Sequence, residues 1–399
     1  MKEVRGVRVW GQPEERALAQ AERCAGHPAA AQVCLMADAH VGYGVPIGGV
    51  IAYRDAVSPS AVGFDIACGI KAVRTDMPAD AIGDRLPTVL DDIARAVAFG
   101  IGRSSPEPVD HPVLEDEAWS ELPEIAGLRR KAAAQLGTVG SGNHFVDLLI
   151  DGHGALWVAA HFGSRGLGYG ICGGFLNLAA NRAFDVNPPR EDMDAPPVVL
   201  DARASLGEAY LRAMGLAGRY AYAGRDHVVG QVLEILGARA EETVHNHHNF
   251  AWSEEHQGER FLVVRKGATP AWPGQAGFVG GSMGDWAAVV SGVDTPEAAA
   301  ALHSTVHGAG RIMSRTAARG KHRKGQAGIR GLVTRQDMTE ATRRFGVLVR
   351  GGDVDEAPQV YRPLKPVLEA HAGSVQVLRR LRPLGVVMAG ADVRDPYKD

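Results

Sequence analysis

The sequence has 399 residues, 45% of them hydrophobic and 22% charged, which is ordinary for a globular protein with a large buried core. Its formal net charge of −3 gives no general attraction for nucleic acid. A protein that binds RNA ends needs only a local basic patch beside its site. The charge therefore neither supports nor excludes an RNA substrate.

Three features argue against a membrane or secreted protein. No apolar run approaches the roughly 18 residues that a membrane span requires. The N-terminal segment MKEVRGVRVWGQPEERALAQ carries charges too early and too often for a signal peptide. The cysteines are unevenly spaced without a CxxC pair, which argues against a disulfide framework: Cys24, Cys34, Cys68 and Cys172. We expect a cytoplasmic protein.

The first half of the chain alternates between helix and strand patterns. Helices are expected at 14–25, 88–99 and about 125–135, and strands at 48–53 and 70–75, with a turn at Ser58-Pro59 between the two strands. A short apolar run covers 32–36. The apolar runs 146–150 and 156–160 predict a hairpin, and each ends next to a polar, Gly-rich motif. Strands that end in this way deliver side chains into a site.

The second half opens with a Pro- and Asp-rich loop at 187–197. A long helix is expected at 207–236, strands at 261–266 and 286–291, and helices at 296–303 and 311–319. Residues 331–352 carry short strand signals, and 357–381 are mostly helical in pattern. No linker is long enough to divide the chain. We therefore expect one mixed α/β (α+β) domain over residues 1–399, with mixed sheets around a central metal and nucleotide cleft.

The segment GFDIACGI places Asp65 and Cys68 three residues apart, offering a hard oxygen and a thiolate. Alone the pair is weak evidence, because an acid near a cysteine is often incidental and cysteine is often a small buried apolar residue. Histidines on Gly- or Asn-rich turns strengthen it: His144, His161, His245, His247 and His248. Imidazole is the commonest metal ligand, although a lone histidine is more often structural. Mixed oxygen, nitrogen and sulfur donors suit zinc, iron or manganese.

The segment STVHGAGRIMSR joins a helical run to a Gly-Ala-Gly turn and then to the expected helix at 311–319. Arg311 and Arg315 would project from one face of that helix beside its N-terminus, which is a phosphate-binding arrangement. His307 opens the turn. A histidine there either attacks phosphorus to give a phosphoramidate or only hydrogen-bonds the phosphate. The local sequence leaves both readings open.

Two further Gly-rich segments, GTVGSGN (137–143) and GGSMG (280–284), are flexible enough for backbone N–H groups to converge on an anion. Either alone is weak, because such turns are common. The chain has neither a GxxxxGK[ST] phosphate loop nor a GxGxxG segment after a strand. A bound nucleotide would therefore use another arrangement.

These residues lie in a series of motifs that follow one another along the chain. The motifs are MADAHVGYGVPIGG, SPSAVGFDIACGI, QLGTVGSGNHF, HFGSRGLG, HHNF, RKGATPAWPG, GGSMG, STVHGAGRIMSRTAA, EAPQVY and RPLGVV. Together they closely resemble the RtcB family of RNA-splicing ligases, from about residue 30 to residue 388. Several motifs are long, so the resemblance is far more specific than any single element.

The resemblance implies an RNA ligase that depends on GTP and manganese. Its substrates would be an RNA 2′,3′-cyclic phosphate or 3′-phosphate end and a 5′-hydroxyl end. In the family a histidine attacks the α-phosphorus of GTP and becomes guanylylated. GMP then passes to the RNA 3′-phosphate, and the 5′-hydroxyl displaces it.

The resemblance also assigns residues. The guanylylated histidine matches His307. One Mn²⁺ would be held by Asp65, Cys68 and His144, and a second by Cys68, His161 and His248, with Cys68 bridging. The expected nucleotide contacts are Asn143, His144, Phe145, Asp147, Asn249, Gly281, Ser282, Met283, Gly284, His307, Gly308, Ala309, Gly310 and Tyr361. The residues expected to hold RNA phosphates are Arg165, Arg311 and Arg315.

The chain departs from the family pattern mainly on the nucleotide side. Met388 replaces a lysine expected near guanine, and Asp147 replaces a glutamate expected to read the base. Other departures are Ala37, Phe162, Asp285, Trp286, Ala287 and a tail beyond Gly390 that includes Lys398. These changes affect guanine selectivity more than catalysis and suggest a divergent paralogue. Its substrate could be a cleaved tRNA or rRNA, or a DNA 3′-phosphate end.

Three alternatives remain beside ligation. The first is an enzyme that caps 3′-phosphate ends of RNA or DNA without sealing them. The second is a metal-stabilised protein that binds RNA ends without turnover. The third, a hydrolytic metalloenzyme, would leave His307 and the two arginines without a purpose.

Overall fold

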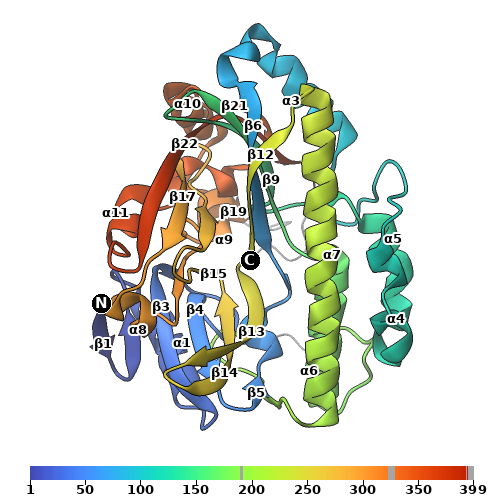
Figure 1. Ribbon diagram of the computed structural model, residues 1–399, viewed down its shortest axis with the longest axis vertical. Helices are drawn as coiled ribbons and strands as arrows, with labels where there is room; N and C mark the ends of the chain where they lie inside the picture. The colour runs from blue at the N-terminus through green and yellow to red at the C-terminus, as the bar shows by residue number, and fades with distance from the viewer. Residues whose placement is uncertain (189–191, 322–328, 392, 394–399) are drawn as a thin grey trace.

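The computed structural model describes residues 1–188, 192–321, 329–391 and 393, and two β-sheets make up its centre (Figure 1). The first sheet has six strands in the order β1–β2–β3–β4–β14–β13. Their bounds are Lys2–Val4, Val7–Val9, Ala30–His40, Ile47–Tyr53, Glu259–Lys266 and Asn249–His256, in that order. His40 at the end of β3 and Asn249 at the start of β13 both line the cavity described below.

The second sheet has the order β12–β6–β10–β9–β22–β17–β16, and β21 pairs in parallel with β22. The bounds in that order are Ala240–His247, Gly69–Pro78, Ala155–Phe162, Phe145–Asp151, Val375–Gly390, Ala287–Gly292 and Ala276–Val279, with Leu348–Gly352 for β21. The expected hairpin is confirmed, since β9 and β10 pair antiparallel with Leu156 opposite Ile150. The other strands form short pairs: β5 (Ala56–Val57) with β11 (Leu200–Asp201), β15 (Ala268–Pro270) with β18 (Ser304–Val306), β7 (Ala98–Phe99) with β8 (Thr138–Gly140), and β19 (Gly320–Lys321) with β20 (Ile329–Arg330).

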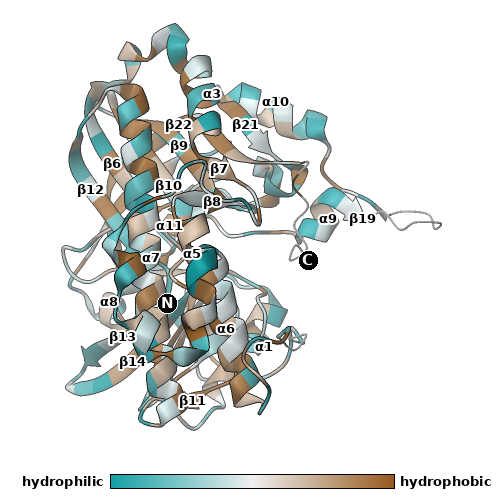
Figure 2. Cartoon of the chain, turned by 90° about the vertical axis from the view of Figure 1, so that its right-hand side faces the viewer, coloured by the Kyte–Doolittle hydropathy of each residue, from teal (hydrophilic) through white to brown (hydrophobic). Residues whose placement is uncertain are grey.

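The long helix α7 (Ser205–Leu236) connects the two sheets (Figure 1). Its first half, with Tyr210 and Tyr220, packs into an apolar cluster shared with the first sheet and α6 (Arg165–Ala179). Its second half, with Val229 and Val232, packs against the second sheet and α3 (Leu86–Ala96). Apolar and polar residues alternate along the helix, as Figure 2 shows, because its buried positions recur at helical spacing. The predicted helix at 207–236 is confirmed.

The remaining helices are short and surround the sheets. They are α1 (Glu15–Ala25), α2 (Pro59–Val62), α4 (Ala118–Glu121), α5 (Arg129–Gln135), α8 (Pro296–Ala300), α9 (Arg315–Arg319), α10 (Arg335–Phe345) and α11 (Leu364–Glu369). The mixed α/β class is therefore confirmed. In place of the turn expected at Ser58-Pro59, Ser58 caps the helix α2 by accepting a hydrogen bond from the Ala61 amide. Across the part of the chain that the structure describes, we find no helix both long and apolar enough to cross a membrane.

The helix predicted at 311–319 is wrong in its first turn. Helix α9 begins only at Arg315, because the Ser314 hydroxyl accepts a hydrogen bond from the Ala317 amide and caps the helix there. Arg311 instead forms an isolated β-bridge with Tyr361. Arg311 and Arg315 therefore do not share a helix face, and only Arg315 belongs to the helix.

Two predictions near the C-terminus are confirmed only in part. The strand signals over 331–352 are confirmed at β21, whereas 335–345 form α10, which starts with a capping box between Thr334 and Asp337 and ends before Gly346 in the left-handed conformation. The segment 357–381 is helical only in α11, and from Val375 it becomes the strand β22. That strand pairs with β17 and then β9, and these long-range partners outweigh its local helical pattern.

A buried histidine beneath the end of β3 gives a pH prediction. His371 accepts a hydrogen bond from the Ala37 amide, 3.1 Å away, and burial lowers its pKa to about 4. The unfolded chain, with an ordinary histidine pKa of about 6.5, binds more protons between these values, so stability falls as pH drops from about 6.5 to 4. This histidine contributes on the order of 3 kcal/mol to that fall. Urea unfolding of His371→Gln should show a weaker pH dependence, and exposed His153→Gln should not. Equal slopes for all three proteins would contradict this.

Candidate active site

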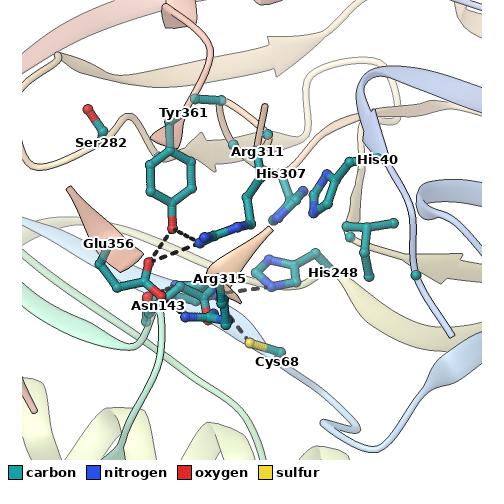
Figure 3. Close-up of a pocket in the computed structure, with 18 of the residues that line it drawn as sticks. His40, Cys68, Asn143, His248, Ser282, His307, Arg311, Arg315, Glu356 and Tyr361 are labelled. Atoms are coloured by element: carbon teal, nitrogen blue, oxygen red, sulfur yellow. Dashed lines mark hydrogen bonds and ion pairs between the residues drawn. The ribbon is translucent and has the colours of Figure 1, made fainter. Parts of the chain in front are cut away.

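A cavity of about 610 Å³ opens where the two sheets meet, and most of the predicted site residues line it (Figure 3). The first sheet contributes the end of β3 with His40 and the start of β13 with Asn249. The second sheet contributes Phe145 and Asp147 of β9 and His161 of β10. Loops after β16 and β18 complete the wall. Residues from 14 to 388 thus converge on one space.

Two sets of potential metal ligands share the Cys68 thiol. Asp65, Cys68 and His144 form one set, and Cys68, His161 and His248 form the other, with the donor atoms of each set within 4.8 Å of one another. The Cys68 sulfur lies 3.2 Å from His161 Nε2 and 3.6 Å from His144 Nε2. These are the two sets that the family resemblance implies.

The imidazole rings are oriented so that Nε2 faces the cluster. His144 Nδ1 lies 2.9 Å from the Val139 carbonyl oxygen, and His161 Nδ1 lies 3.1 Å from that of Asn143. Because a carbonyl can only accept, Nδ1 of His161 carries the proton and its Nε2 keeps its lone pair. His144 Nε2 lies 2.9 Å from Asp65 Oδ2, where a metal ion would take the place of a proton between the two donors. Burial lowers the pKa of His161 and of His248, which keeps both rings neutral as ligands must be.

The pKa values of the two acidic donors, Asp65 and Cys68, shift in opposite directions. Burial raises the pKa of Asp65, but the neighbouring His144 and Arg165 outweigh it and leave this pKa well below its usual range. Burial and the Asp65 charge raise the pKa of the Cys68 thiol well above its usual value. A divalent cation bound between Asp65 and Cys68 would instead lower the pKa of the thiol, since a coordinating thiol is deprotonated outright. The donor set therefore fits a divalent metal with mixed ligands.

His307 lies beside this cluster but belongs to neither set. Its ring centroid is 4.9 Å from that of His248, and its Nδ1 lies 2.7 Å from Oδ2 of the fully buried Asp38. The same carboxylate oxygen accepts the amides of His307 and Gly308 at 3.2 and 3.3 Å. Burial raises the pKa of Asp38, but His307 more than offsets this and keeps the carboxyl ionised. The Asp38 carboxylate thus holds Nδ1 of His307, which leaves Nε2 available to react with a substrate.

Asp38 and His40 were not predicted as site residues, although both lie in the MADAHVGYGVPIGG motif. His40 lines the cavity, and burial lowers its pKa to about 4. The available signal was a charged residue near the end of an otherwise apolar strand, β3, in which residues 33–39 are buried. A buried aspartate there needs a partner, but the sequence does not show that the partner is His307.

The three arginines expected at RNA phosphates are held by other groups. Arg311 Nη2 donates to the Asp355 carbonyl oxygen at 2.8 Å, and its guanidinium lies over the Tyr361 ring. Arg315 is paired with the buried carboxylates of Asp355 and Glu356, and Glu356 also accepts from the Tyr361 hydroxyl (Figure 3). Arg165 does not line the cavity, and its guanidinium lies against Gly140, with Nη1 3.1 Å from His144 Nδ1.

Most of the expected nucleotide contacts lie on the cavity wall. They are Asn143, Phe145, Asp147, Asn249, Gly281, Ser282, Met283, His307, Gly308, Ala309, Gly310 and Tyr361. Gly284 lies outside the lining, against Pro358. The Asn249 side chain is already engaged, because it donates to the Asp65 carbonyl oxygen and accepts from the Gly267 amide.

The apolar end of the cavity contains Met388 and Asp147, the two residues that differ from the family pattern near the expected guanine base. Met388 pairs in register with Phe145 across β22 and β9, and both line the wall. Asp147, two residues further along β9, has a buried Oδ1 without a hydrogen-bond partner, and burial raises its pKa well above the usual value. An unpartnered carboxyl between apolar walls fits a ligand that donates hydrogen bonds there. Lys398 lies outside the described residues.

Comparison with known proteins agrees with this geometry. The family model described as tRNA-splicing ligase RtcB matches residues 20–126 and 117–389. The RNA-splicing ligase RtcB of Escherichia coli strain K12 is 31% identical over 377 residues, covering 88% of each chain. The tRNA-splicing ligase RtcB of Archaeoglobus fulgidus is 30% identical over 454 residues, covering 94% of this chain and 91% of the relative. The chain belongs to the RtcB family.

Proposed function

We propose that this protein is a GTP- and Mn²⁺-dependent RNA ligase that joins a 3′-phosphate or 2′,3′-cyclic phosphate end to a 5′-hydroxyl end. The observation that carries the proposal is His307, whose Nδ1 lies 2.7 Å from the buried Asp38 carboxylate beside two sets of metal donors. A histidine held in this way presents Nε2 as a nucleophile, because the anion fixes the proton on Nδ1.

In the first step Nε2 of His307 attacks the α-phosphorus of GTP. The Nε2–P bond forms, the bond to the bridging oxygen breaks, and pyrophosphate leaves. The Nδ1 proton stays directed at Asp38, which stabilises the positive charge that develops on the ring. The turns after β16 and β18, with Ser282 and Gly308 on the cavity wall, would bind the phosphates through backbone N–H groups.

Two Mn²⁺ ions fit the two donor sets, with Cys68 in both. When bound, they would neutralise the charge on the attacking and leaving oxygens of an in-line displacement. Asp65, His144, His161 and His248 would hold the ions in place around the shared sulfur.

The Cys68 thiolate requires a compartment that keeps cysteines reduced, which supports a location in the cytoplasm. The packing of α7 on both sheets supports one domain.

The later steps transfer GMP to RNA and then release it. An oxygen of the RNA 3′-phosphate attacks the phosphorus on His307, the Nε2–P bond breaks, and a 3′-pp-G end forms. The 5′-hydroxyl oxygen then attacks the RNA 3′-phosphorus, GMP leaves and the hydroxyl proton passes to solvent. Arg311 and Arg315 stand at the cavity wall, where a phosphate would compete with Glu356 for their guanidinium groups.

We expect Asp147 to set nucleotide selectivity. Burial alone favours the neutral form of Asp147, but two N–H donors of a bound guanine would favour the ionised form, because hydrogen bonds to the charged form lower the pKa. The carboxylate then accepts from both donors, whereas an amide offers one acceptor and one donor. Asp147→Asn should therefore lower the preference for GTP over ATP by at least about tenfold, while Asp147→Glu should keep it. The measurement is the extent of protein labelling by each nucleotide at equal concentration. An unchanged preference in the asparagine variant would exclude Asp147 as the base-reading group.

The decisive assay for ligation uses an RNA with a 3′-phosphate end, a second RNA with a 5′-hydroxyl end, GTP and Mn²⁺. A joined product supports sealing. A persistent 3′-pp-G end despite an available 5′-hydroxyl would support capping alone, and repetition with a DNA 3′-phosphate tests the other end type. Binding without either product, unaffected by His307→Ala, would instead indicate a protein that binds RNA ends without turnover.

A further inference from the structure

A buried arginine outside the catalytic cavity contacts the backbone beside both metal sets. Arg225 lies on α7 where the helix passes from the first sheet to the second, and its side chain is fully buried. It does not line the cavity. The hydrogen bonds found for its guanidinium go to neutral groups: two backbone carbonyls and two imidazole rings. A buried cation is costly, so this arrangement needs a reason beyond packing.

The two carbonyls are those next to metal-set residues. Arg225 Nη1 donates to the Ala67 oxygen at 3.0 Å and to the Phe162 oxygen at 2.6 Å. Ala67 directly precedes Cys68, and Phe162 directly follows His161. One nitrogen therefore ties together the two backbone segments that carry the shared thiol and one of the imidazoles.

Ala67 is also strained. Its φ is +59°, in the left-handed region that a residue with a Cβ adopts only at a cost. Its amide donates to the Asn249 carbonyl oxygen at 2.7 Å, and its own carbonyl accepts from Arg225. The Ala67 oxygen also lies 3.2 Å from His247 Nδ1, so Arg225 is the nearer of its two side-chain partners. Without Arg225, the carbonyl would lose this nearer partner, and Cys68 would be free to turn with the peptide.

The two remaining histidines of the HNHHNF segment explain how Arg225 is held. Nε of Arg225 donates to His245 Nε2 and Nη2 lies next to His247 Nδ1, both at 2.9 Å. Tyr222, one turn earlier on α7, packs against both rings, with centroids 4.2 and 4.0 Å away. His245 and His247 thus orient the guanidinium, while His248 alone of the three faces the metal cluster.

We propose that Arg225 is a positioning residue that holds Cys68 and His161 in place for both metal sets by binding the carbonyl oxygens of Ala67 and Phe162. This rests on the proposed metal-dependent function. Arg225 acts through the backbone and touches no reacting atom. Its loss should weaken metal binding at both sets, because Cys68 belongs to both.

The test is a titration with Co²⁺ alone, followed by the thiolate-to-cobalt absorption band. Arg225→Gln should bind Co²⁺ about 10–100-fold more weakly than the unchanged protein, as is usual when a group supporting the ligands is lost. Arg225→Lys keeps the positive charge but lacks the forked guanidinium group, so its Co²⁺ affinity should lie between those of Arg225→Gln and the unchanged protein. The matched control is Arg219→Gln, an exposed arginine on the same helix that pairs with Asp116. It should bind Co²⁺ normally.

Ala67→Gly distinguishes positioning from a general loss of structure. Glycine adopts the left-handed conformation without the Cβ cost, so Ala67→Gly combined with Arg225→Gln should recover roughly tenfold of the lost affinity. A fold defect elsewhere would not be rescued in this way. Binding of Co²⁺ by Arg225→Gln within twofold of the unchanged protein, or no rescue by Ala67→Gly, would overturn the proposal. If the unchanged protein itself bound no Co²⁺, the metal-dependent function would fail instead.

Discussion

Replacing Cys68 with alanine is expected to abolish binding of both divalent ions and to reduce RNA joining to background. The reason is geometric, since the Cys68 sulfur is the donor that the two sets share. We expect affinity for Mn²⁺ to fall by at least about 100-fold, because loss of a direct ligand exceeds the cost of losing a supporting group. Metal content after dialysis, together with the ligation assay, measures both effects.

Two variants sharpen this prediction. His144→Ala removes a donor of the first set alone and should leave the second set, Cys68, His161 and His248, able to bind one ion. Cys24→Ala removes a buried thiol from α1 and should change neither metal content nor joining. Retention of two ions by Cys68→Ala would contradict a bridging thiolate.

Replacing His307 with asparagine is expected to reduce nucleotide transfer by at least about 10⁴-fold, because the variant has no nucleophile for phosphorus. Asp38→Asn should cost about 10²–10⁴-fold, since an amide no longer fixes the proton on Nδ1. Neither change removes a donor of the metal sets, so metal content should be unchanged in both. Rates of pyrophosphate release report the step directly.

A 3′-pp-G RNA prepared beforehand separates the roles further. It enters the pathway after His307 has acted, so His307→Asn should still seal it to a 5′-hydroxyl end. Cys68→Ala should not, because displacement of GMP also needs the ions. Failure of both variants on this substrate would mean that His307 acts in sealing as well, and the division of roles would be wrong.

Features with a local or strongly patterned signal were predictable from the sequence. Helix α7 follows from the spacing of Tyr210, Met214, Tyr220 and Val229, all of which are buried. The β9–β10 hairpin follows from two apolar runs around a polar turn. The residues of both metal donor sets lie in specific motifs, and the structure brings them together as those motifs imply.

Features that depend on distant partners were not predictable. Strand β22 contains a helical pattern but is fixed by β17 and β9, and Arg311 is drawn into a bridge with Tyr361. The pairing of Asp38 with His307 joins positions far apart in the chain, and neither has a local signal for the other. The pairing of Arg315 with Asp355 and Glu356 is of the same kind.

The most direct test of the account is mass spectrometry of the protein after incubation with GTP and Mn²⁺. We predict a mass increase of one GMP per chain, located on the peptide that contains His307, lost in acid and kept in base. The adduct should be absent from His307→Asn and should disappear when RNA with a 3′-phosphate is added. An adduct on a lysine, or none on a protein with both ions bound, would contradict the proposal that His307 is the nucleophile.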